Sequence, residues 1–506
     1  MAASVRLRSA ELMTKVDPNA PLIAGVAQET WRSGSPGPVE MLAEVCRGAL
    51  ADAGGQAAST ASVDAMCVVR YVSAEHSDPA GLVSASAGIA AAQRIHTSIG
   101  GDTPQAAVGE LATRIAAGQL DSALICGGEA LATVSRHLKA GTDPGWSDPA
   151  PNARATEVFG TDREANRPEE TGAGLFAPIM IYPLFEHAIW ATEGGTTAEL
   201  QARIGKLQER FSKVAATNPH AWSPDPVTAE YVATPSPDNR LVSLPYTKLM
   251  NSNIQTDQAA AVLLCSHSKA DALGIPQDRR VYLHGSSHAT EPWFVSERAD
   301  LGLSPALGRA ASSAFEQAST GIDDISLLDI YSCFPSAVRV AGREIGFDPI
   351  NDSREPTVTG GLAFAGGPGN GYVLHSIASM VERLRQQPSE QGLVTAVGWY
   401  LTKHASGVYG ATPPENPFSA ATNFAEPSGA RKVAPLDWSG PATAETATAI
   451  YERDGSASYA VLTAITADGT RVMRSTSDQS QIAALPDGPV TGMSAKMQSG
   501  SGFDLS

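Results

Sequence analysis

Residues 357–385 read T-V-T-G-G-L-A-F-A-G-G-P-G-N-G-Y-V-L-H-S-I-A-S-M-V-E-R-L-R, and this stretch decides the fold. Six glycines fall between Gly360 and Gly371, and apolar residues at helical spacing follow from Tyr372 to Leu384. Glycines let the backbone approach a ligand closely, and the N–H groups at the start of a helix suit a phosphate or an oxyanion. A glycine-rich loop before a helix is also often no more than a tight connection, so the rest of the chain must decide.

Composition excludes several classes of function. The 506 residues carry a net charge of −17, which argues against a surface for nucleic acid or anionic membranes. The amino-terminal residues lack the apolar core of a signal peptide, and there is no apolar run long enough to span a membrane. The five cysteines are scattered without a C-x-x-C pair, and the histidines form no metal motif. We therefore expect a cytoplasmic protein with no metal site and no disulfide framework.

Strands and helices alternate in the first 130 residues, which predicts βαβ units in a parallel sheet covered on both faces. Gly100 and Gly101 precede a helix that Asp102 or Thr103 could cap, with Pro104 in its first turn. The predicted strands are 21–27, 63–72, 95–99 and 122–126, and the predicted helices are 39–53, 79–93 and 104–117.

The regular alternation stops between residues 131 and 242, where one clear helix, 197–216, is predicted in an inserted loop domain. It resumes at residue 256, and the second half repeats the order of the first. The expected domains are 1–130 with 243–270, the insertion 131–242, a second half at 271–412, a linker at 413–441, and an antiparallel β domain at 442–506 with a disordered tail from Gln498. Its strands lie around the turns Asp454-Gly455 and Asp468-Gly469. The elements predicted in the second half are strands 256–265, 280–285, 325–330 and 393–400 and helices 306–317 and 336–345.

Four blocks in order resemble the thiolase superfamily, closest to its sterol-carrier-protein-type branch. Arg114 to Ala130 is similar to the helix–strand unit that ends in a G-G-x-E-like turn, and T-D-Q-A-A-A from Thr256 is similar to (N/S)-D-G-A-A-A. D-I-Y-S-C-F from Asp329 resembles N-E-A-F or H-D-C-F, and the glycine loop resembles G-G…G-H-P-x-G. The resemblance covers roughly residues 20–410. It implies an α/β thiolase fold with two similar βαβαβ halves in five αβαβα layers, and the appended domain, OB-like, resembles that of actinobacterial (mycobacterial) thiolase-like proteins of type 1.

The resemblance also implies that the usual chemistry is lost. Thiolases use two cysteines and a histidine, with oxyanion holes built from side chains and backbone N–H groups. Their nucleophile aligns with Gly101, the histidine of G-H-P with Gly367, and the second cysteine with Ala396, while Tyr331 replaces the Asn or His of the N-E-A-F or H-D-C-F motif. Ser98 lies near the nucleophile position but belongs to the preceding segment. We therefore expect no ordinary Claisen condensation or thiolysis.

Five residues remain as candidates for a catalytic site: Tyr331, Cys333, Asn370, Tyr372 and His375. Tyrosine hydroxyls can act as acid, base or oxyanion donor, and thiolase-fold aldolases on steroid side-chain CoA thioesters look similar in using tyrosines. The alternatives are that both tyrosines plug an emptied site, that Cys333 and His375 are packing residues, and that Asn370 only adopts a turn conformation.

The resemblance implies CoA or acyl-CoA as the ligand, with no covalently bound cofactor. In the family the insertion and the residues before D-G-A-A-A hold CoA, which makes Lys248, Asn251 and Asn253 the binding candidates. Three hypotheses follow: a CoA-binding protein of lipid metabolism without thiolase activity, an acyltransferase or aldolase/lyase on an acyl-CoA that uses Tyr331, Tyr372 and His375, or an interaction module acting through its carboxy-terminal domain. We expect a monomer, because the loop beside the usual dimer strand is rewritten here.

Overall fold

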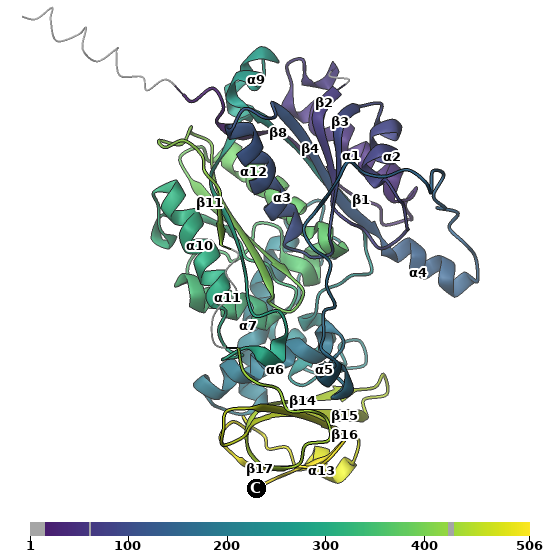
Figure 1. Cartoon of the computed structure of the whole chain (residues 1–506), viewed down its shortest axis with the longest axis vertical. Helices are drawn as coiled ribbons and strands as arrows, with labels where there is room; N and C mark the ends of the chain where they lie inside the picture. Colours follow the sequence, from purple (N-terminus) through teal and green to yellow (C-terminus); the bar gives the residue numbers. More distant parts are fainter. Residues whose placement is uncertain (1–15, 60–61, 424–429) are drawn as a thin grey trace, which may run out of the picture.

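The computed structural model describes residues 16–59, 62–423 and 430–506, and it contains one long mixed sheet and a second, smaller sheet at the carboxy-terminal end of the molecule (Figure 1). The long sheet has eleven strands, ten of them in the order β10-β11-β12-β9-β1-β8-β4-β2-β3-β5. Its two halves meet where β1 and β9 pair at only two positions, Leu22 with Tyr282 and Ile23 with Val281. The halves are therefore two sheets joined along one edge.

The two halves share one pairing pattern, which confirms the repeat predicted from the order of elements. In the first half β2 and β4 are parallel, whereas β4–β8 and β8–β1 are antiparallel. In the second half β10 and β11 are parallel, whereas β11–β12 and β12–β9 are antiparallel. The sheet is thus mixed rather than parallel. The strands are β1 (Pro21–Thr30), β2 (Ser62–Val68), β3 (Ala90–Thr97), β4 (Ser122–Ala130), β5 (Glu157–Phe159), β8 (Asp257–Ser266), β9 (Val281–Thr290), β10 (Leu327–Asp329), β11 (Gln391–Gly398) and β12 (Lys403–Gly410).

Helices complete the five layers expected of a thiolase fold. The outer layers are formed by α1 (Pro38–Ala53) and α2 (Pro79–Ala87) on one half and by α10 (Pro305–Ala318) and α11 (Pro335–Ile345) on the other. Between them, α3 (Thr103–Ala116) and α12 (Tyr372–Gln386) pack against strands of both halves. Because both of its sides face a sheet, α12 is buried at almost every position of its first ten residues.

The region 131–242 holds more regular structure than its sequence predicted. Besides α7 (Thr197–Ala215) the region contains α6 (Pro178–Glu193). The apolar residues of α6 lie on all sides of the helix, and Pro183 lies within it. Hydrophobic periodicity therefore does not identify α6, and the proline argues against a helix there. The sequence also gave no sign of β12. The other helices of this region are α4 (Leu131–Ala140), α5 (Pro168–Gly172) and α8 (Ala229–Ala233), and α9 (His267–Ala272) follows β8.

Two expectations about the carboxy-terminal part are wrong. The segment treated as a linker contains β13 (Ala421–Asn423), which pairs with β9. The tail is not disordered, because β18 (Phe503–Leu505) pairs with β17 (Ser494–Met497) and Phe503 is buried. The strands predicted around the two Asp-Gly turns are present as β14 (Gly440–Tyr451), β15 (Ala457–Ile465) and β16 (Arg471–Thr476), followed by α13 (Gln479–Ala483). Two short strands at and just after the end of the insertion, β6 (Leu241–Ser243) and β7 (Tyr246–Thr247), join this antiparallel sheet.

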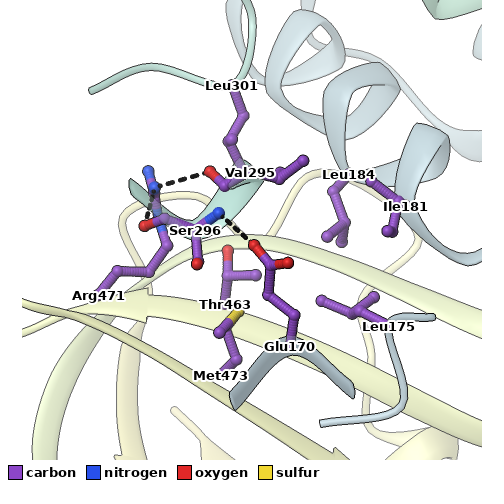
Figure 2. Close-up of a pocket in the computed structure, with 10 residues that line it drawn as sticks. All are labelled: Glu170, Leu175, Ile181, Leu184, Val295, Ser296, Leu301, Thr463, Arg471 and Met473. Atoms are coloured by element: carbon purple, nitrogen blue, oxygen red, sulfur yellow. Dashed lines mark hydrogen bonds between the residues drawn. The ribbon is translucent and has the colours of Figure 1, made fainter. Parts of the chain in front are cut away.

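The small sheet is fixed to the rest of the molecule through a buried arginine (Figure 2). Arg471, on β16, is fully buried and donates from Nη1 to the carbonyls of Ser296 at 2.8 Å and Arg298 at 2.6 Å. Its other nitrogens bind Glu445 on β14, at 2.7 Å and 2.5 Å. The cavity left at this junction is only about 10 Å³, the space of at most one water. The carboxy-terminal domain is therefore docked by close packing as well as by polar contacts.

Candidate functional site

A buried carboxylate organises the site. Asp329, the last residue of β10, is fully buried, and its two oxygens accept hydrogen bonds from the glycine-rich stretch and from α12. Burial raises the pKa of this carboxyl, and the hydrogen bonds oppose that rise. The donors are Thr357 Oγ1 at 2.8 Å, Val358 N at 3.0 Å, Thr359 N at 3.2 Å, Thr359 Oγ1 at 3.0 Å, Tyr372 Oη at 3.1 Å and Ser376 Oγ at 2.7 Å.

Tyr372 belongs to this cluster. Its hydroxyl lies 2.7 Å from Thr359 Oγ1 in addition to its bond to Asp329, and the side chain is 1 % exposed. Burial, with Asp329 nearby, raises the pKa of the phenol well above its usual value. Through these contacts Tyr372 holds the glycine-rich stretch against the end of β10.

Tyr331 occupies the space beside Gly101. A Cβ added at Gly101 would lie 2.3 Å from Tyr331 Oη and 2.6 Å from the carbonyl oxygen of Val397. The ring lies edge-on to Tyr372 with centroids 5.7 Å apart, and its backbone N–H donates to Thr395 Oγ1 at 2.9 Å. Tyr331 is 7 % exposed, and burial raises its pKa well above the usual value for tyrosine. The phenol thus stands where the resemblance puts the nucleophile.

Asn370 ties together two loops at the same place. Its Oδ1 accepts from Gly100 N at 3.0 Å, and its Nδ2 donates to the carbonyl of Arg70 at 2.7 Å. Both ends of the amide therefore bind backbone groups, and Asn370 fixes the Gly100–Gly101 turn beside the start of α12.

His375 faces away from this group, toward β1. Its Nδ1 lies 3.0 Å from Gln28 Oε1, so Nδ1 donates, and Nε2 has no hydrogen-bond partner among the described residues. Burial lowers the pKa of His375 to about 3, so the ring is neutral at physiological pH. The contacts assign this histidine to packing between α12 and the sheet.

Cys333 joins the site to the predicted CoA segment. Its carbonyl accepts from Ser252 N at 3.0 Å, while Asn253 donates through N to the carbonyl of Leu362 and accepts at its own carbonyl from Gly367 N, both at 2.9 Å. The Cys333 side chain is partly exposed, but burial of the sulfur raises its pKa to about 12. The thiol is therefore protonated at neutral pH and a weak nucleophile.

Small residues occupy the other two positions from which the catalytic side chains are missing. Ala396 is buried on β11 opposite Ala405, and a Cβ at Gly367 would have its nearest neighbour 3.3 Å away.

Among the CoA candidates Lys248 is exposed, whereas Asn251 donates from Nδ2 to the carbonyl of Thr247 at 2.6 Å. The buried Oδ1 of Asn251 has no hydrogen-bond partner in the part of the chain that the structure describes. The described residues contain no group of side chains that could hold a metal ion, and no described helix is long and apolar enough to cross a membrane.

Sequence reasoning missed two contributors. Gln258 stands where the D-G-A-A-A motif has glycine, and it donates to the carbonyl of Ala365 at 2.9 Å and that of His220 at 3.1 Å. The glutamine in place of the motif's glycine is the sequence feature that could have indicated this role. The second is the pair Asp102–Lys403, 3.2 Å apart beside Gly100. Asp102 does not cap α3 through its side chain, so it serves this ion pair instead.

Comparison with known proteins identifies the architecture. The family model for the thiolase-like protein type 1 additional C-terminal domain matches residues 425–500. A monomeric SCP2-thiolase-like protein type 1 from Mycobacterium smegmatis superposes with a TM-score of 0.80 and 29% identity, over 97% of this chain and all of that one. The chain is therefore similar to that protein over nearly its whole length, and residues 425–500 match the additional carboxy-terminal domain.

Two acetyl-CoA acetyltransferases match a smaller part of the chain, 31% and 29% of its length. An acetyl-CoA acetyltransferase of Methanothermobacter thermautotrophicus is 31% identical over 155 residues, and one of Pseudomonas aeruginosa is 27% identical over 145. These alignments span 38% and 34% of the relatives' lengths. The Ltp2–ChsH2(DUF35) aldolase superposes with a TM-score of 0.59 and 19% identity over 78% of this chain and 98% of that one, which shows the fold alone.

Proposed function

We propose that this thiolase-like protein binds CoA or an acyl-CoA and does not catalyse thiolase chemistry. The observation that carries the proposal is the contact between Tyr331 Oη and Gly101, because it leaves no room for a nucleophilic side chain at that position. Gly367 and Ala396 supply no acid or base at the two other positions. Cys333 does not replace the missing thiols, since burial keeps it protonated.

Support for a CoA thioester as ligand comes from the segment 248–253. It runs beside Cys333 and Gly367 through backbone hydrogen bonds, so a ligand lying along it would reach the glycine-rich loop. The exposed ammonium of Lys248 is available for phosphate. The free state of all five thiols suits a cytoplasmic protein.

Calorimetry on the full chain tests this proposal. CoA should bind, and Lys248→Ala should weaken binding of CoA more than binding of pantetheine, which lacks the phosphates. Lys206→Ala, an exposed lysine on α7, is the matched control and should leave both affinities unchanged. Absence of heat with millimolar CoA and acyl-CoA would remove the binding proposal.

A second candidate function is an acyltransferase or aldolase/lyase reaction on an acyl-CoA, and the position of Tyr331 favours it. Of the two tyrosines only Tyr372 is bonded to Asp329, whereas the Tyr331 phenol lies beside Gly101 and, because burial raises its pKa, stays protonated and can donate a hydrogen bond. Retro-aldol and thiolysis assays on steroid and fatty acyl-CoAs test it. If Tyr331→Phe leaves a measured activity intact, the tyrosine mechanism is wrong. The third candidate, an interaction module, predicts a protein partner and no ligand.

A further inference from the structure

A groove of about 540 Å³ lies between the carboxy-terminal domain and the rest of the chain, beside the Arg471 anchor. Glu445, which binds Arg471, lines it on the side of the small sheet. Residues of α6, of α11 and of the segment 299–303 line it on the other side. Sites for small molecules often lie at domain interfaces and enclose about 300–1,000 Å³. The groove is therefore large enough for a small organic ligand.

The groove is not a sign of loose packing between the two domains. Leu301 lines it and also lines the cavity of about 10 Å³ around Arg471 (Figure 2). The same junction is thus close-packed at one surface of Leu301 and open at another. A poor fit between the domains would leave space at both places.

Most of the accessible surface in the groove is apolar. Leu303 is 44 % exposed at its rim, and Ile465 on β15 is partly exposed. Contiguous apolar surface that stays open to water often marks a binding site. The apolar lining residues include Ala188, Ala191, Leu301, Leu303, Ala444 and Ile465.

Arg343, in the last turn of α11, brings an accessible positive charge to the groove. Its side chain is 29 % exposed, and its guanidinium binds the described residues through Nη2 alone, so Nε and Nη1 are available. The nearest carboxylate is Glu193, at 3.4 Å, which also pairs with Arg203 and Arg339. Arg339 pairs with Glu186 as well. Three guanidinium groups therefore face two carboxylates, and Arg343 makes the longest of these contacts.

The other charges of the groove do not cancel this excess. Both oxygens of Glu445 are bound by Arg471, at 2.7 Å and 2.5 Å, so this pair is neutral. Arg431 donates to backbone carbonyls and has no carboxylate partner among the described residues. Its charge offsets that of Asp300, an exposed carboxylate at the rim. One positive charge remains, at Arg343.

We propose that this groove is a second binding site, for a small molecule with an apolar body and one carboxylate, for example a medium-chain fatty acid. The carboxylate accepts hydrogen bonds from Arg343, and the apolar body lies against Leu301 and Ile465. A guanidinium offers a carboxylate two parallel N–H donors, so it favours this group over a hydroxyl or an ammonium. The groove shares no residue with the segment 248–253, so the proposal stands or falls independently of CoA binding.

Three eight-carbon probes with different head groups test the site: octanoate, octan-1-ol and octylammonium. Calorimetry on the full chain should show octanoate binding roughly tenfold more tightly than the other two, and crystals soaked with octanoate should show its carboxylate at Arg343. Arg343→Gln should weaken octanoate binding by roughly tenfold, the effect of one lost hydrogen bond between charged groups. Arg343→Lys keeps the charge and should weaken it less. Arg453→Gln, an exposed arginine that does not line the groove, should leave it unchanged.

Ala191→Leu provides a second variant, because Ala191 lines the groove and is only partly buried, so a larger side chain would fill the space. It should abolish octanoate binding while CoA binding stays unchanged. The proposal is overturned if octanoate does not bind at millimolar concentration, if crystals place it elsewhere, if octan-1-ol or octylammonium binds as tightly, or if Arg343→Gln leaves the affinity unchanged. Thermal unfolding of each variant shows that it is folded before binding is compared.

Discussion

The hydroxyl of Tyr331 occupies the space that a side chain at Gly101 would need. Gly101→Ala would bring a Cβ to 2.3 Å from Tyr331 Oη. We expect it to lower the free energy of unfolding by about 1–3 kcal/mol through overpacking. In the background of Tyr331→Ala the cost should be smaller, since only the carbonyl of Val397 still opposes the new methyl.

The measurement for this pair is a double-mutant cycle by urea denaturation. Gly321→Ala is the control, because the nearest atom to its added Cβ is 3.8 Å away. Additive effects at Gly101 and Tyr331 would contradict the contact. Gly101→Cys should give no thiolysis of acetoacetyl-CoA, because it restores a thiol without an acid or base at Gly367 or Ala396.

Removing the hydroxyl of Tyr372 should affect stability rather than chemistry. Tyr372→Phe deletes the bond to Asp329 at 3.1 Å and the contact with Thr359 at 2.7 Å. A buried acceptor then loses a donor, which costs about 1–3 kcal/mol. Tyr331→Phe is the matched control and should lower Tm less. Equal melting temperatures for the two variants would show that Tyr372 does not hold the loop.

Stability should fall on acidification because buried histidines must stay neutral. The pKa of His375 is lowered from 6.5 to about 3, so below pH 6.5 the unfolded chain binds a proton that the folded chain does not. The stabilisation is complete above pH 6.5 and is lost as pH falls toward 3, with a slope of up to about 1.4 kcal/mol per pH unit. His375→Gln should show a shallower loss between pH 6.5 and 4 in urea titrations. His137→Gln on α4 should match the original chain.

The order of strands and helices predicted the two halves, and the four motifs of the family resemblance predicted the layers, while the emptied catalytic positions stay a prediction. Glycine placement, helical spacing and four ordered motifs are readable residue by residue. The roles of the candidate site residues could not be predicted from such local signals. Asp329 binds donors up to 47 positions away, and His375 contacts Gln28 across 347 positions, so pairing and burial decide their roles. The tail from Gln498 looked disordered because its polar composition gave no sign that Phe503 is buried beside β17.

The carboxy-terminal domain should depend on Arg471 for its attachment. Arg471→Met would leave the carbonyls of Ser296 and Arg298 without this donor and Glu445 without its cation. Breaking a buried pair in this way costs about 3–5 kcal/mol. Limited proteolysis should then release the domain more readily and Tm should fall. Arg453→Ala, an exposed change in the same domain, should alter neither, and an unchanged protease pattern for Arg471→Met would contradict the anchoring role.

The chain should remain a monomer, because its own strand β5 covers the carboxy-terminal part of the edge of β3. Ile95, His96 and Thr97 pair in parallel with 157–159, so the backbone groups on that side of β3 are occupied. Arg114 holds β5 in place with two bonds to Glu157, at 2.9 Å and 2.7 Å. The free edge is thereby divided between the three residues of β5 and residues 90–94 of β3, which leaves no long continuous edge for pairing with a second copy. Sedimentation at micromolar concentration should give one species of monomer mass. Arg114→Ala should loosen β5 and raise hydrogen exchange at 95–97, whereas Arg154→Ala should not, and a stable dimer of the unmodified chain would refute the prediction.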